Sequence, residues 1–245
     1  MTCTVYALED SELTVVPGID LAFKQSSLNI VNNGIPEDNA IKPSYMTVIP
    51  SLLIAYGKFY SLLSYDTPLT EHHEILREQK PTEFKHHDRS YLRQEATFTV
   101  GYRLLPVLSI FAGAIKGDTK IRAVDTVYNG TTTQVEPNDL SFTTRGYFAG
   151  LSTSHNFEGN GTLALSAAYT TLSGEFFRGT FKGEEETFKS NSANGYSTSL
   201  SWSGQMSDSV IYQIGYRYAK YNYDFGILQI VEPVQGLSFG LRKYF

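Results

Sequence analysis

The feature that most constrains the fold of this chain is a two-residue periodicity that returns in segment after segment. From residue 196 to 203 every odd position is serine, whereas the even positions carry Tyr196, Thr198, Leu200 and Trp202. Successive side chains of a β-strand point to opposite faces, so this segment is expected to be a strand with one hydroxyl-lined face. A sheet of such strands is apolar on its other face, as the wall of a membrane-spanning barrel must be.

The same alternation is clear in three further segments, near residues 13–24, 95–104 and 210–219. Their apolar faces carry Leu13, Val15, Pro17, Ile19, Leu21 and Phe23, then Ala96, Phe98, Val100, Tyr102 and Leu104, then Val210, Tyr212, Ile214, Tyr216 and Tyr218. Weaker alternation predicts six more strands, at about 44–56, 58–66, 106–117, 142–157, 162–174 and 234–245. The sequence therefore predicts about ten strands.

Short and long connections alternate strictly between these strands. The short ones lie at about 57–58, 105–106, 158–161 and 204–208, and the long polar ones at about 25–42, 67–90, 118–141, 175–193 and 222–233. Membrane barrels have tight turns at one end and long loops at the other. We therefore expect an all-β, closed antiparallel transmembrane barrel with both termini on the periplasmic side, where the turns lie.

Two alternatives bear on this interpretation. A soluble barrel or sandwich would also alternate, but its outer face would carry abundant Lys and Glu, whereas the second face here is mainly Ser, Gly, Thr and Ala. Asn129-Gly130 favours a tight hairpin turn because both residues tolerate positive φ. We expect a hairpin there that extends the fifth and sixth strands above the membrane, with a twelve-strand barrel as the alternative.

The end of the chain, from Gly236 to Phe245, is an alternating segment with a terminal aromatic residue. It resembles the C-terminal signature of bacterial outer-membrane β-barrel proteins, which the barrel-assembly machinery reads during insertion. The residues that this resemblance implies to face lipid and guide insertion are Leu237, Phe239, Leu241 and Phe245. Lys243 departs from the pattern, but a lysine near the membrane boundary can extend its amine to water.

Composition narrows the class of protein and its partners. Only 18% of residues are charged and 13% are aromatic, a mixture that favours strands, and apolar runs fall far short of the roughly 20 residues of a membrane helix. The formal net charge is −5 and no basic face with interleaved aromatics is evident, so nucleic acid is not an expected partner. Because Cys3 is the single cysteine, we expect no disulfide framework, and we expect no cofactor.

The first residues lack the charged start and apolar core of a signal peptide, although Val5-Tyr6-Ala7 resembles the small-residue end of a cleavage site. We expect residues 1–7 to be a signal-peptide remnant and residues 8–245 to form a single transmembrane barrel domain. An ordinary frayed N-terminus fits residues 1–7 equally well.

Aromatic side chains near strand ends are expected to form two girdles at the membrane interfaces, where apolar rings and polar tips are both accommodated. The girdle toward the long loops would contain Tyr45, Tyr91, Tyr147, Phe176 and Tyr221. The girdle toward the turns would contain Tyr56, Phe59, Tyr102, Phe157, Trp202 and Phe245.

Charged residues on the hydroxyl-rich faces are expected inside the barrel. They are Asp20, Lys24, Glu95, Arg103, Arg217 and Arg242. Buried charges must be paired or hydrated, so we expect a polar network across a tight interior, or alternatively the lining of a narrow pore with anion preference. General diffusion is excluded because a barrel needs about 16 strands before its interior becomes an open channel.

Other candidate chemistry lies in one long loop and one strand. His72, His73, His86 and His87 stand beside carboxylates in the loop and could bind Zn²⁺ or Cu²⁺, although adjacent histidines rarely share one ion. A hydrolase would need a nucleophile beside a base, but Ser154 and His155 are expected on opposite faces of a strand. An omptin-like protease would need acidic pairs and a histidine at the barrel mouth, and no such constellation stands out.

The sequence thus favours a non-enzymatic outer-membrane barrel that contacts membrane lipid and presents polar loops to an external partner or surface. A narrow solute or ion channel is the first alternative. The metal-binding histidine loop and a barrel-embedded hydrolase are the second and third.

Overall fold

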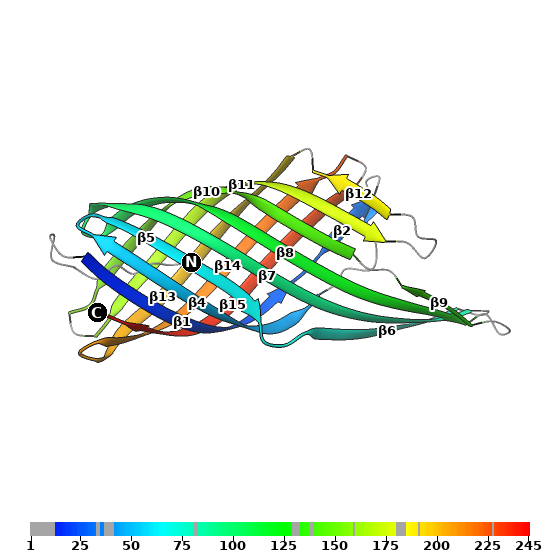
Figure 1. Cartoon of the computed structure of the whole chain (residues 1–245), viewed down its shortest axis with the longest axis horizontal. Helices are drawn as coiled ribbons and strands as arrows, with labels where there is room; N and C mark the ends of the chain where they lie inside the picture. Colours follow the sequence, from blue (N-terminus) through cyan, green and yellow to red (C-terminus); the bar gives the residue numbers. More distant parts are fainter. Residues whose placement is uncertain are drawn as a thin grey trace.

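A computed structural model describes residues 13–245 apart from 33–34, 37–41, 81–82, 129–132, 138–139, 159, 180–184, 191 and 227. The described chain is all-β (Figure 1). Ten strands form the wall: β1 (Leu13–Ser26), β4 (Ser44–Tyr56), β5 (Phe59–Pro68), β7 (Glu83–Leu105), β8 (Leu108–Tyr128), β10 (Leu140–Asn156), β11 (Thr162–Gly179), β13 (Ser192–Ser207), β14 (Val210–Asp224) and β15 (Leu228–Lys243). Shorter strands extend it: β2 (Asn29–Asn32), β3 (Ile35–Pro36), β6 (His72–Lys80), β9 (Thr133–Pro137) and β12 (Glu185–Lys189).

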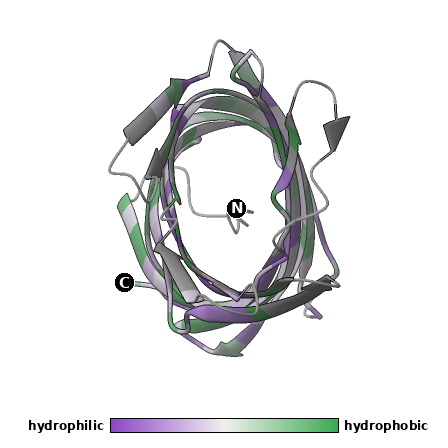
Figure 2. Ribbon diagram, turned by 90° about the vertical axis from the view of Figure 1, so that its right-hand side faces the viewer, coloured by the Kyte–Doolittle hydropathy of each residue, from purple (hydrophilic) through white to green (hydrophobic). Residues whose placement is uncertain are grey.

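The wall closes on itself. Each wall strand pairs antiparallel with its neighbours, and β1 pairs with β15 from Gly18 opposite Arg242 to Ser26 opposite Val234. Seen nearly along the axis, the strands make a complete ring (Figure 2). The prediction of a closed antiparallel ten-strand barrel is confirmed, and the twelve-strand alternative is wrong.

The predicted alternation decides which side chains enter the lumen. On β13 the Ser201 side of the strand is buried while Leu200 is 46% exposed on the outside. Large apolar side chains are exposed in the same way around the outer wall, including Ile19, Leu165 and Phe239. Together these residues form a lipid-facing belt. None of the residues that the structure describes forms a helix able to cross a membrane.

The barrel has two different ends. At one end, here called the turn end, two-residue connections join β4 to β5, β7 to β8 and β13 to β14. Gly57 has a φ of 57° in the first of these, a conformation that suits glycine. The C-terminus also lies at the turn end (Figure 1). The opposite end is the loop end.

At the loop end β7 and β8 continue far beyond the other wall strands, with β6 paired to β7 and β9 paired to β8 (Figure 1). The expectation of long loops over 67–90 and 118–141 is therefore wrong for most of their length. These segments are polar on both faces, so they lack the apolar alternation that marks a lipid-facing strand. Asn129-Gly130 lies outside the described residues, but Tyr128 and Thr133 on either side pair as a hairpin requires.

Candidate functional site

The lumen near the loop end is filled by apolar side chains, here called the roof. It consists of Leu28, Tyr45, Tyr91, Ile115, Ile121, Phe142, Leu172, Phe176, Ala193, Ala219, Tyr221, Tyr223, Phe225 and Ile230. The rings of Phe142 and Tyr223 meet edge to face with centroids 4.6 Å apart. Such contacts exclude water across the section that they fill.

The roof corrects the expected girdle near the loops. Tyr45, Tyr91, Phe176 and Tyr221 are buried inside the barrel, and only Tyr147 of that group faces outward, 77% exposed. Each of these four lies an even number of positions from a lumen residue of its own strand: Tyr45 from Thr47, Tyr91 from Glu95, Phe176 from Thr170 and Tyr221 from Arg217. Of the six residues expected in the girdle near the turns, Tyr56, Phe59, Phe157 and Phe245 are exposed, whereas Tyr102 and Trp202 are half-buried.

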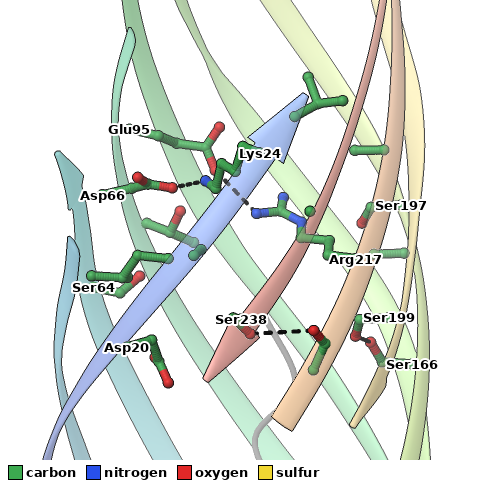
Figure 3. A pocket seen from close by; sticks show the side chains of 18 of the residues that line it. Asp20, Lys24, Ser64, Asp66, Glu95, Ser166, Ser197, Ser199, Arg217 and Ser238 are labelled. Carbon is green, nitrogen blue, oxygen red and sulfur yellow. Dashed lines mark hydrogen bonds and ion pairs between the residues drawn. The ribbon is translucent and has the colours of Figure 1, made fainter. Parts of the chain in front are cut away.

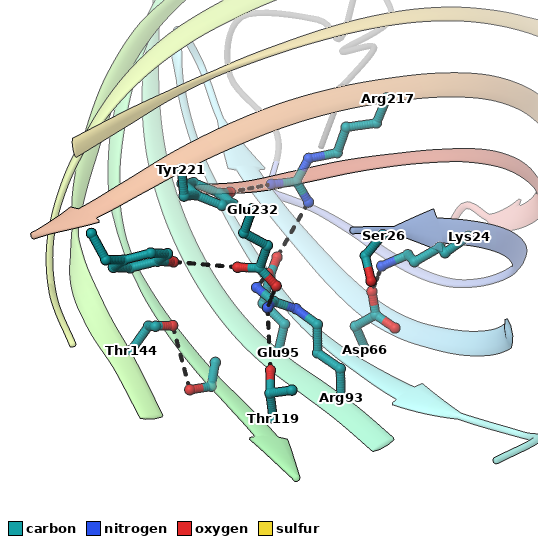
Figure 4. Close-up of polar contacts among 12 residues, drawn as sticks. Lys24, Ser26, Asp66, Arg93, Glu95, Thr119, Thr144, Arg217, Tyr221 and Glu232 are labelled. Carbon is teal, nitrogen blue, oxygen red and sulfur yellow. Dashed lines mark hydrogen bonds and ion pairs between the residues drawn. The ribbon is translucent and has the colours of Figure 1, made fainter. Parts of the chain in front are cut away.

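An unbroken series of ion pairs, here called the ionic chain, crosses the lumen beside the roof (Figure 4). Arg217 on β14 donates to Glu95 on β7 at 3.2 Å, and Glu95 also accepts from Arg93 at 3.3 Å. Arg93 then bonds Glu232 on β15, which is wholly buried. Five steps around the ring separate β7 from β14, so the ionic chain joins opposite walls.

Neutral groups complete the coordination of the ionic chain. Arg93 also donates to Thr119 Oγ1 at 3.3 Å, Arg217 donates to the Tyr221 hydroxyl at 3.4 Å, and the Tyr223 hydroxyl donates to Glu232 Oε2 at 3.4 Å. Buried ions are tolerated when opposite charges and hydrogen bonds replace water. The two tyrosines belong to the roof, so roof and ionic chain form one structure.

A cavity of about 130 Å³ lies in the lumen beside the ionic chain, and we call it the chamber (Figure 3). Lys24 forms an ion pair with Asp66 on one side, and Ser166 and Ser199 share a 2.6 Å hydrogen bond on another. Toward the turn end Arg242 donates to Asp20 at 2.9 Å. Gly240 makes room for that pair, because a Cβ there would lie 1.6 Å from Asp20 Oδ1.

The residues predicted to lie in the lumen are largely brought together. Asp20, Lys24, Glu95, Arg217 and Arg242 line the chamber. Arg103 lies four residues beyond Thr99 on the same face of β7, and it does not line the chamber. Their role as a pore lining or as a structural network stays a prediction.

Three further lumen charges were missed from the sequence: Asp66, Arg93 and Glu232. Arg93 shares the alternation of Glu95 but lies two residues before the predicted strand. Asp66 shares the alternation of Ser64 and ends the strand predicted at about 58–66, so its face was visible in the sequence. No alternation in the sequence pointed to Glu232. It lies in a segment that we expected to be a loop, between Val231 and Pro233, where no alternation is visible.

The strand register does not bring the four loop histidines together. His72 and His73 pair with Tyr91 and Ser90, whereas His86 pairs with Arg77 and His87 with Leu76, farther out on the same hairpin. His72 Nδ1 lies 3.1 Å from the Ser44 carbonyl oxygen. Among the described residues no group of three or more His, Cys, Asp or Glu side chains could hold a metal ion. Metal binding by these histidines stays a prediction.

The remaining predicted residues lie on the outer wall or apart from one another. Leu237, Phe239, Leu241 and Phe245 are all exposed outside the barrel, where lipid or an assembly factor could reach them. On β10 His155 is exposed and packs its ring against Phe157 at 4.6 Å, while Ser154 lies on the opposite face. Residues 1–7 lie outside the described part of the chain.

Comparison with known proteins identifies the fold. No protein-family model and no curated protein sequence matches the chain. The outer membrane protease OmpT from Escherichia coli superimposes with a TM-score of 0.68 at 11% sequence identity, over 98% of this chain and 99% of that one. Neisserial surface protein A superimposes with a TM-score of 0.41 at 13% identity, over 94% and 97%. With its closed ring of ten antiparallel strands and apolar outer wall, this chain has the fold of the bacterial outer-membrane β-barrel proteins.

Proposed function

We propose that this chain is a non-enzymatic outer-membrane barrel that holds its loop end outside the cell and binds an anionic surface there. In this arrangement lipid covers the outer belt and both termini lie on the periplasmic side. The barrel-assembly machinery reads the last strand during insertion, through Leu237, Phe239, Leu241 and Phe245.

The observation that carries this proposal is the filled lumen. The roof and the ionic chain occupy the barrel between the chamber and the loop end, and Glu232 within them has no exposed surface. A conducting pore would need a continuous water path through this section. A barrel that is blocked inside and extended outside is better suited to contacts on its surface than to transport.

A basic stripe on the outer face near the loop end supports an anionic partner. It consists of Lys116, Lys120 and Arg122 along β8 and of Arg145, which pairs with Lys116 from β10; all four are exposed. From 116 to 122 the stripe spans about 20 Å of strand. Asp118 interrupts it, 3.7 Å from Lys116, but bases remain in excess. Such a stripe attracts polyanions in a salt-dependent way.

The test uses the detergent-folded protein with dextran sulfate as the polyanion and uncharged dextran of the same length as the reference. We expect saturable binding of dextran sulfate alone, weakened by salt. The double variant Lys120→Glu/Arg122→Glu should weaken binding at least about tenfold, because it reverses two charges of the stripe. Lys58→Glu is the matched control, since Lys58 is exposed in the turn between β4 and β5, at the opposite end of the barrel from the stripe. Equal affinity of both variants, or equal binding of the two dextrans, would contradict the proposal.

Planar-bilayer recording tests the alternative of a narrow channel. We expect no steady conductance from the wild-type protein, because the apolar side chains of the roof fill the lumen near the loop end. A steady anion-selective conductance that changes in Arg217→Gln would instead assign the lumen charges to a pore.

Peptide hydrolysis is a second candidate, favoured by the likeness to OmpT over nearly the whole length of both chains. His72 and Glu74 lie on one face of β6 at the barrel mouth, and Glu74 Oε2 is buried without a hydrogen-bond partner among the described residues. An imidazole near a carboxylate could serve as a general base toward water. Cleavage of unstructured peptides that is lost in Glu74→Gln would replace the non-enzymatic proposal, and the absence of cleavage would exclude this candidate.

A further inference from the structure

The chamber contains polar atoms that the protein itself leaves without partners. Asp66 Oδ1, Ser201 Oγ and Arg217 Nε make no hydrogen bond within the described part of the chain. Asp66 is 7% exposed and Ser201 2%, so bulk water does not readily solvate them. All three residues line the chamber. Buried polar atoms are normally satisfied, so a group that occupies the chamber is expected to bond them.

The three atoms require different hydrogen-bond partners. Asp66 Oδ1 is a carboxylate oxygen and accepts, Arg217 Nε–H donates, and the Ser201 hydroxyl can do either. The other oxygen of Asp66 is already paired with Lys24, and the terminal nitrogens of Arg217 already bond Glu95 and Tyr221. A ligand must therefore bring a donor to one place and an acceptor to another.

Charge balance limits the ligand further. Four bases line the chamber, namely Lys24, Arg93, Arg217 and Arg242, and three acids, Asp20, Asp66 and Glu95, while Glu232 behind them neutralises Arg93. A net ion would leave this balanced set with one uncompensated charge in a poorly solvated space. A molecule with one positive and one negative group would not.

From these observations we propose that the chamber binds a small zwitterion, with its ammonium group on Asp66 and its carboxylate on Arg217 and Ser201. The volume of about 130 Å³ is roughly ten times the smallest space that holds one water molecule, so it admits a solute of a few heavy atoms and excludes large ones. The roof lies between the chamber and the loop end, and a second cluster of buried apolar side chains, Val16, Leu53, Ala55, Tyr60 and Leu62, lies toward the turn end. This inference does not rest on the surface interaction proposed above, and each can fail alone.

Calorimetry on the detergent-folded protein tests the proposal with four probes: glycine, β-alanine, acetate and methylammonium, at equal ionic strength. We expect saturable heat with glycine or β-alanine, and at least about tenfold weaker binding of acetate and methylammonium, each of which offers only one of the two groups. No saturable heat with either zwitterion would overturn the proposal. Equal binding of acetate would overturn it in favour of an anion site, and equal binding of methylammonium in favour of a cation site.

Two variants locate the site. Ser201→Ala should weaken zwitterion binding about three- to tenfold through one lost hydrogen bond, without loss of folding, because its hydroxyl has no hydrogen-bond partner among the described residues. Asp66→Asn should abolish it. Ser173→Ala, on the exposed outer face of the neighbouring β11, is the matched control and should bind as wild type does. If Asp66→Asn does not fold, Ser201→Leu, which fills the chamber, takes its place, and undiminished binding by Ser201→Leu would refute the site.

Discussion

At the turn end of the barrel the rings of Tyr56 and Phe59 are exposed on the outside, whereas at the loop end those of Tyr91 and Tyr223 are buried in the lumen. There Tyr91 packs against Tyr45, and Tyr223 packs against Phe142. The residue types are the same and so is their place near strand ends. Only their position in the two-residue alternation differs. An aromatic ring at a strand end therefore marks a membrane interface only when the residues two positions away on the same strand also face lipid.

The largest expected effect comes from breaking the inner structure at its ions. Arg93→Ala leaves Glu232 buried without its partner, so we expect the free energy of unfolding to fall by about 3 to 5 kcal/mol. Urea unfolding in lipid vesicles, followed by the emission of Trp202, measures it. The double variant Arg93→Leu/Glu232→Leu should recover most of the loss, since Glu95 keeps Arg217. A loss below about 1 kcal/mol in Arg93→Ala would show that the ionic chain is hydrated.

The next effect contrasts an inward and an outward ring on one strand. Phe142→Ala opens a cavity in the roof and is expected to lower the free energy of unfolding by about 3 kcal/mol. Tyr147→Ala, on the outer face of the same β10, should change it by less than about 1 kcal/mol. Equal losses in the two variants would contradict the assignment of opposite faces.

A smaller effect tests the outer wall. Leu165 lies outside on β11 within the apolar belt, so Leu165→Arg should destabilise the barrel in lipid by about 2 to 4 kcal/mol. Thr171→Arg, exposed on the same strand nearer the loop end, should cost about 0 to 1 kcal/mol. If Leu165→Arg were the milder of the two, the belt would not be the lipid-embedded region.

The smallest expected effect on stability comes from Ser166, which follows Leu165 and faces the lumen. Ser166 faces the lumen and shares a hydrogen bond with Ser199, so Ser166→Ala should lower the free energy of unfolding by about 1 kcal/mol. The outward Ser173→Ala should leave it nearly unchanged. If Ser173→Ala lowered the free energy of unfolding more than Ser166→Ala does, the hydrogen bond between the two lumen serines would not be a source of stability.

The strands, their faces and the ends of the barrel could be predicted because they depend on local alternation. Leu165 and Ser166 show their opposite faces in the sequence itself. The partners across the lumen could not be predicted in this way, because the meeting of Arg93 with Glu232 depends on how ten strands are staggered when the ring closes. The relative positions of the four histidines could not be predicted for a related reason, since their spacing in the hairpin follows from a strand register that the sequence does not state.

The seam between β1 and β15 joins nine paired positions near the two ends of the sequence, whereas β7 and β8 pair along more than twice that length with only a short turn between them. Neighbouring strands can therefore pair early across short turns, but the ring closes only when the first and last wall strands meet. A fragment that lacks β15 would expose two unpaired strand edges, each able to capture another chain, so aggregation rather than a smaller barrel is the expected fate of truncated products.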